Sequence, residues 1–68
     1  MRNYRRYVVV NERKKIEHSY STDLGNDNAF IYASECADHR TMNGRVFGED
    51  STGARQVVYT SKTYRDEA

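Results

Sequence analysis

The chain has 68 residues and carries 11 Lys and Arg against 10 Asp and Glu, so its formal net charge is +1. A chain of this length folds as one small domain, over residues 1–68, whose core rarely supplies more than about 3–5 kcal/mol of stability without help. The balance of charge excludes a strongly acidic DNA mimic and a strongly basic histone-like or ribosomal protein.

The first predicted element is a strand over residues 4–10, where β-branched and aromatic residues dominate. Both faces of this strand are apolar toward its C-terminal end, so we expect the face away from the core to be partly covered as well. A polar break over residues 11–14 predicts a hairpin loop. Residues 15–21 then alternate, with Ile16 and Tyr20 on one face, which predicts a half-buried second strand.

Residues 22–28 combine Gly, Asn and Asp, which predicts a loop before the best helix candidate, residues 29–40. Small residues that let a helix lie close on a sheet recur every four positions along it, at Ala29, Ala33 and Ala37. The run FIY at residues 30–32 is also typical of a short strand, so the sequence leaves residues 29–33 as either helix or strand.

The second half of the chain is predicted to form another hairpin. Asn43 and Gly44 tolerate the positive φ that a helix end or turn requires. Residues 45–49 predict a short third strand, residues 50–53 a turn, and residues 54–62 a last strand with apolar groups on both faces.

The predicted order is strand, strand, helix, strand, strand. It indicates an α+β fold of order ββαββ, a four-stranded antiparallel sheet with one helix packed on one face. The other face must meet water, a partner or a second copy of the chain, and the sequence does not decide which face carries the helix. We expect residues 64–68 to form a charged tail that frays.

Three residues could in principle bind a metal or supply a nucleophile and a base: His18, Cys36 and His39. Their spacing matches no zinc motif, and a fourth ligand is not evident. A domain of this size also has little room for a substrate pocket, which typically measures about 300–1,000 Å³. Cys36 lies on the apolar side of the predicted helix and fits a small packed residue. We therefore predict no catalytic residue, no metal site and no cofactor.

Charge is distributed unevenly along the chain, with a net of +5 over residues 1–15 and −4 over residues 16–68. Arginine and tyrosine interleave on the first strand, and three basic residues follow in its loop. This pattern suits a protein interface or a nucleic-acid backbone, and charge on an edge strand also serves simply to prevent unwanted strand pairing. The candidate binding residues are Arg5, Arg6, Tyr7, Arg13, Lys14 and Lys15.

Targeting signals are not evident in the sequence. No segment approaches the ~20 apolar residues of a membrane span. The N-terminal sequence MRNYRRYVVV lacks the apolar region of a signal peptide. A single cysteine cannot close an internal disulfide, which excludes a disulfide-stabilised secreted scaffold. We expect a soluble cytoplasmic protein with a reduced thiol.

A resemblance in the order of elements rests on three segments: the hairpin YRRYVVVNERKKIEHSYS, the helix AFIYASECADHR and the hairpin RVFGEDSTGARQVVYTSK. The chain resembles small phage-encoded inhibitors of the anti-CRISPR type that place one helix on an antiparallel sheet. The resemblance covers nearly the whole chain but includes no shared motif, so it transfers no binding residue. It implies a non-enzymatic protein of the host cytoplasm that sterically blocks a host defence or nucleoprotein complex. The alternatives are a small RNA- or DNA-binding module and a structural homodimer.

Overall fold

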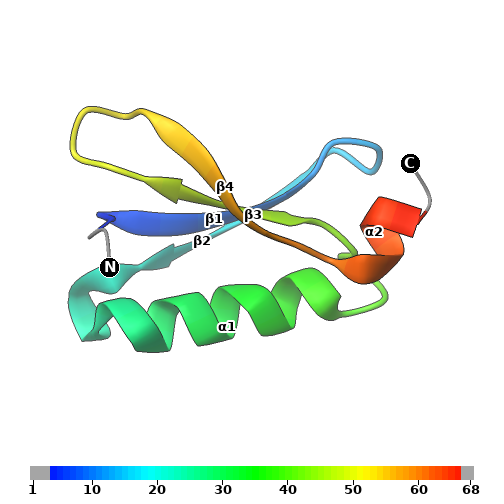
Figure 1. Ribbon diagram of the computed structural model, residues 1–68, viewed down its shortest axis with the longest axis horizontal. Helices are drawn as coiled ribbons and strands as arrows, with labels where there is room; N and C mark the ends of the chain where they lie inside the picture. Colours follow the sequence, from blue (N-terminus) through cyan, green and yellow to red (C-terminus); the bar gives the residue numbers. More distant parts are fainter. Residues whose placement is uncertain (1–3, 67–68) are drawn as a thin grey trace.

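The computed structural model describes residues 4–66 and has a four-stranded antiparallel sheet with a long helix across one face (Figure 1). The predicted α+β class and ββαββ order are confirmed, and a short second helix follows the last strand. The elements in chain order are β1 (Arg6–Asn11), β2 (Ile16–Ser21), the 3-10 turn η1 (Thr22–Leu24), α1 (Asn26–Asp38), β3 (Arg45–Glu49), β4 (Arg55–Thr60) and α2 (Lys62–Asp66).

The strands lie in the order β2-β1-β3-β4, so each hairpin contributes one central and one edge strand. In the middle of β1, Val9 pairs with His18 of β2 and with Val46 of β3. The long-range ladder between β1 and β3 therefore joins the two hairpins, and α1 carries the chain between them.

Helix α1 packs on the sheet face formed by Tyr7, Val9 and Val46. Residues 29–33, for which the sequence allows either helix or strand, are helical. The helix begins at Asn26, earlier than predicted. Its small residues explain the close packing, because the three alanines at 29, 33 and 37 are at most 3% exposed. Gly25 precedes the helix with a φ of 114°, which only glycine adopts without strain.

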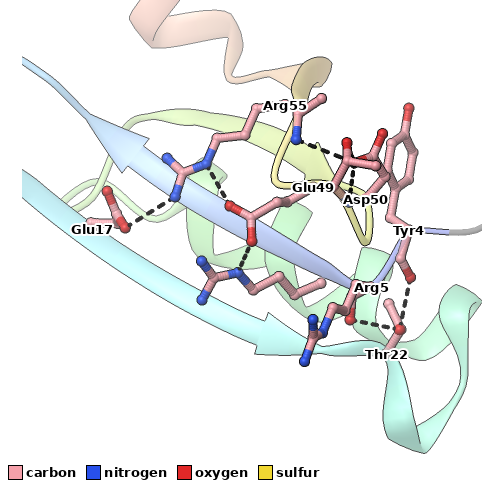
Figure 2. A network of polar contacts seen from close by, with 10 residues as sticks. Tyr4, Arg5, Glu17, Thr22, Glu49, Asp50 and Arg55 are labelled. Atoms are coloured by element: carbon pink, nitrogen blue, oxygen red, sulfur yellow. Dashed lines mark hydrogen bonds and ion pairs between the residues drawn. The ribbon is translucent and has the colours of Figure 1, made fainter.

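The face of the sheet away from α1 also buries apolar groups, as the two apolar faces of the first strand indicated. Val8 points to this open face and is fully buried, next to Phe47 of β3. Arg55 of β4 reaches across the open face of the sheet to Glu17 of β2 (Figure 2). In the strand register, the row that contains Val8 lies between the rows of these two residues. The aliphatic parts of arginine side chains cover apolar surface well, so an arginine that lies across a sheet face helps to bury it without a second helix layer.

Asn11 connects three loops at the far end of β1. Its Nδ2 donates to the carbonyl oxygens of Met42 and Asn43, each at 2.7 Å, and its Oδ1 accepts from the backbone N–H of Lys14 at 3.0 Å. Asn43 in turn accepts from the Ser61 hydroxyl at 3.0 Å. The prediction that Asn11 belongs to a polar hairpin loop is wrong, since it ends β1 and is 1% exposed.

The C-terminal residues 64–66 do not form the frayed tail that we predicted. They belong to α2, and Tyr64 is only 9% exposed. The guanidinium carbon of Arg13 lies 3.9 Å from the centre of the Tyr64 ring, a cation–π contact that holds α2 against the β1–β2 loop. Residues 67 and 68, the remainder of that predicted tail, lie outside the described residues.

Candidate functional site

The six predicted binding residues do not form one surface. Arg5 precedes β1 at one end of the sheet, whereas residues 13–15 form the loop at its other end (Figure 1). The six residues of β1 separate these two groups by about 20 Å. A contiguous stretch of basic residues in the sequence is thus divided between opposite ends of the molecule.

Tyr7 belongs to the core, and its prediction as a surface binding residue is wrong. It is 2% exposed and points toward α1, where its hydroxyl donates to Asn26 Oδ1 at 3.0 Å. Burial raises the pKa of its hydroxyl. The ring also makes edge contacts with Tyr4 and Phe30. Tyr7 therefore positions the start of α1 on the sheet.

Arg6 takes part in a row of charges across the open face of the sheet. Its guanidinium is paired with Glu49 of β3, which also accepts from Arg55 Nε of β4 at 2.8 Å. Arg55 reaches further, to within 3.7 Å of a Glu17 carboxylate oxygen on β2 (Figure 2). This network joins all four strands, so Arg6 and Arg55 stabilise the sheet. Both guanidinium groups already have carboxylate partners within the molecule.

The carboxylate of Glu49 is the centre of this row, and its side chain is only 11% exposed. Hydrogen bonds from Arg6 and then Arg55 lower its pKa from 4.5 to about 2. Since the folded-state pKa lies below the ordinary value, this group stabilises the fold fully above about pH 4.5 and progressively less as the pH falls toward 2.

Glu49→Gln should therefore show a pH-dependent loss of stability. We expect the urea midpoint of the wild type to exceed that of the variant at pH 7, and the gap to shrink below pH 4.5 and close near pH 2. Glu35→Gln is a matched control, because Glu35 is exposed and makes no ion pair within residues 4–66. A gap that persists unchanged down to pH 2 would contradict the assignment.

Two of the predicted loop cations hold neighbouring segments in place. Arg13 stacks on Tyr64 and also donates to its carbonyl oxygen at 3.4 Å. Lys14 Nζ donates to the carbonyl oxygen of Thr41 at 3.0 Å. The β1–β2 loop thereby binds both α2 and the loop that follows α1. Lys15, with a φ of 56°, completes the hairpin turn and is exposed.

The structure gathers basic residues that are distant in the sequence at this end of the sheet (Figure 1). Four segments meet here: the β1–β2 loop, the end of α1 with its following loop, the start of β3, and α2. Within residues 4–66, these segments carry seven basic and three acidic residues, a net charge of +4. We call this region the basic end. Its basic residues are Arg13, Lys14, Lys15, Arg40, Arg45, Lys62 and Arg65, and its acidic residues are Glu12, Asp38 and Asp66.

Four cations of the basic end are exposed, and their side chains make no hydrogen bond or ion pair with other described residues: Lys15, Arg40, Lys62 and Arg65. The rest of the described chain has three basic and six acidic residues, a net of −3. Only Lys15 of the four was among the predicted binding residues. No local pattern could have found the other three, because tertiary packing brings them together.

A groove of about 470 Å³ lies between β2 and α1 and contains the residues considered above as metal ligands. His18 of β2, Cys36 of α1 and His39, which follows α1, all line it. Within residues 4–66, no group of three or more His, Cys, Asp or Glu residues is placed to hold a metal ion. A hydrogen bond to half-buried Cys36, together with burial, raises the pKa of Tyr20.

None of the helices formed by the described residues is long and apolar enough to cross a membrane. Comparisons of the chain with family models, with curated proteins and with solved structures find no match. The geometry and the charge distribution of the described residues are therefore the features from which a function is inferred.

Proposed function

We propose that this chain is a non-enzymatic docking protein whose basic end binds an acidic surface on a larger protein. The gathering of four exposed cations that have no hydrogen-bond or ion-pair partner among residues 4–66 carries the proposal. Such cations attract a complementary surface over a Debye length of about 8–10 Å, and on binding they give up no ion pair with residues 4–66. The acidic remainder of the chain orients the approach, because it is repelled by the same surface.

An acidic protein fits this end better than a nucleic acid does. Single-stranded nucleic acids are held by exposed aromatic rings on which bases stack. Tyr64, the aromatic ring shared by the loops of the basic end, is covered by Arg13 and is 9% exposed. The net charge of +1 also provides little long-range attraction for a polyanion.

Because the order of elements resembles that of phage-encoded inhibitors, we propose that the chain acts as an inhibitor of this kind. The partner is then a host defence or nucleoprotein complex, and binding blocks its working surface sterically. Rigid presentation supports this role, since contacts from Arg13 and Lys14 hold the loops that display the exposed cations. A preorganised surface loses little conformational entropy on binding.

Three matched charge reversals test which end docks: Arg40→Glu and Arg65→Glu at the basic end, and Arg5→Glu at the opposite end. All three arginines are exposed, so the variants differ in position and not in chemistry. The partner is first captured from a bacterial lysate treated with nuclease, purified, and titrated with each variant. We expect each reversal at the basic end to raise Kd about tenfold, and Arg5→Glu to change it by less than about twofold.

The remaining outcomes contradict the proposal in distinguishable ways. An effect of Arg5→Glu as large as that of Arg65→Glu would move the docking surface away from the basic end. Loss of every partner on nuclease treatment, with binding to free RNA or DNA that weakens steeply with salt, would identify a nucleic-acid module instead. Melting temperatures of the three variants check that their folds are equally stable.

A further inference from the structure

The outer edge of β2 offers unpaired backbone groups. Within residues 4–66, β2 is an edge strand that pairs only with β1. The Thr22 N–H donates to the Arg5 carbonyl oxygen, and this bond fixes which backbone groups take part in the ladder. The N–H and C=O groups of even-numbered residues of β2 point toward β1, and those of odd-numbered residues point away from the sheet. The peptide groups of Glu17 and Ser19 therefore point away from the sheet and have no hydrogen-bond partner within residues 4–66.

β2 carries one of the devices that usually prevent strand pairing, the charge of Glu17, whose side chain is 54% exposed. Natural edge strands carry prolines, bulges or exposed charges. The opposite edge strand, β4, has an irregularity in its register with β3 next to Val46 and Phe47. β2 pairs with β1 in regular register, and the chain contains no proline. The one charged acidic residue of β2, Glu17, turns its carboxylate across the open face toward Arg55.

The charges at the two ends of β2 are complementary and favour a second copy of the chain as the partner for this edge. β2 begins beside Lys15 of the basic end and leads into η1 and the start of α1, which carry Asp23 and Asp27. Two copies of β2 that pair antiparallel bring the basic start of each strand to the acidic end of the other. We propose that two copies of this chain associate through β2 in this way, about a two-fold axis at His18, to form a continuous eight-stranded sheet.

The register follows from the faces of the strand. Side chains opposite one another must share a face, so even-numbered residues pair with even-numbered ones. An axis at His18 sets Ile16 opposite Tyr20 of the second copy, and both are half-buried apolar residues that gain cover. An axis at Glu17 would instead set two carboxylates opposite each other. The chosen register also brings Lys15 opposite Ser21, two residues from Asp23 of the second copy.

The groove between β2 and α1 becomes part of this interface. α1 packs mainly against β1, so the two copies of α1 lie on one face of the joint sheet, about 14 Å apart across three strand spacings. Tyr32 lines the groove and is 55% exposed. In the dimer, its ring lies between the two helices. The association thus accounts for a large aromatic side chain left uncovered in one copy.

Disulfide trapping tests both the association and its register, in a Cys36→Ala background. His18→Cys places two thiols at a non-hydrogen-bonded position on the axis, where the Cα atoms lie about 4.5 Å apart, within the range of a disulfide. Ser19→Cys is the matched control, because residue 19 faces residue 17 of the second copy and the two thiols lie beyond about 7 Å. We expect His18→Cys to cross-link under mild oxidation at least tenfold faster than Ser19→Cys. Equal rates, or faster cross-linking of Ser19→Cys, would overturn the proposal.

A second pair of variants examines the free edge without cysteine. Ser19→Pro removes an N–H that points outward and is not used in the β1–β2 ladder, and Ser19→Ala retains it. Sedimentation equilibrium should give twice the chain mass of 7.9 kDa for the wild type and for Ser19→Ala, and the single mass for a folded Ser19→Pro. A wild type that stays monomeric up to about 100 μM would overturn the proposal, whatever the folding of Ser19→Pro.

Discussion

Replacement of Asn11 by leucine is expected to cost about 2–4 kcal/mol of folding free energy, most of what a core of this size supplies. Leucine branches at Cγ as asparagine does, but it is larger and cannot donate to the carbonyl oxygens of Met42 and Asn43. Each buried carbonyl that loses its only side-chain donor costs about 1–3 kcal/mol. The variant should therefore be largely unfolded at 25 °C, as measured by urea titration followed by circular dichroism.

Asn11→Asp separates the lost donor from any change of shape. The carboxylate keeps the outline of the amide but faces two carbonyl oxygens, so we expect at least an equal loss of stability at pH 7. Protonation restores one donor, and the stability of this variant relative to the wild type should therefore rise as the pH falls toward 3. A loss below about 0.5 kcal/mol for Asn11→Leu would show that Asn11 does not hold the loops together.

Gly44→Ala is the second variant for which we expect a large effect, a loss of about 2–3 kcal/mol. A Cβ atom at this position would lie 2.4 Å from the Val10 carbonyl oxygen, which is fixed in the central strand. The backbone of Gly44 cannot withdraw, because its N–H donates to Ala37 and its carbonyl oxygen accepts from Ser61, both at 3.0 Å. The melting temperature should fall by roughly 4–8 °C for each kcal/mol lost.

Gly53→Ala provides the comparison for this variant. A Cβ atom there would meet no atom within 4 Å, but the residue has a φ of 88°. A left-handed conformation costs a non-glycine residue roughly 1–2 kcal/mol, and the open turn lets the backbone relax. Gly44→Ala should thus lower the melting temperature more than Gly53→Ala. The reverse order would show that close approach to β1 is less important than conformational strain.

Local patterns in the sequence correctly predicted the parts of the fold that depend on near neighbours. Alternation placed Ile16 and Tyr20 on one face of β2, and both lie on the side of α1. The recurrence of Ala29 and Ala33 indicated a helix lying close on a sheet, and both residues are buried there. These patterns work because each residue's direction follows from its neighbours in the same element.

The errors concern residues whose environment is determined by distant parts of the chain. Asn11 has the composition of a loop residue, but its burial depends on Met42 and Asn43. The sequence KTYRD is too short to show a helical period, and Tyr64 is held by Arg13, 51 residues away. One error was avoidable: strand alternation already places Arg6 and Tyr7 on opposite faces, so they could not share one binding surface.

The strand order β2-β1-β3-β4 also has a consequence for how fast the chain acquires its structure. Each hairpin pairs residues that are close along the chain, and hairpins form in about 1–10 μs. The ladder between β1 and β3 must instead join Val10 to Arg45 and Arg6 to Glu49, which closes a long loop through α1. We infer that the transition state for folding contains this central seam. Substitutions along β1 and β3 then slow folding, whereas substitutions in α2 mainly accelerate unfolding.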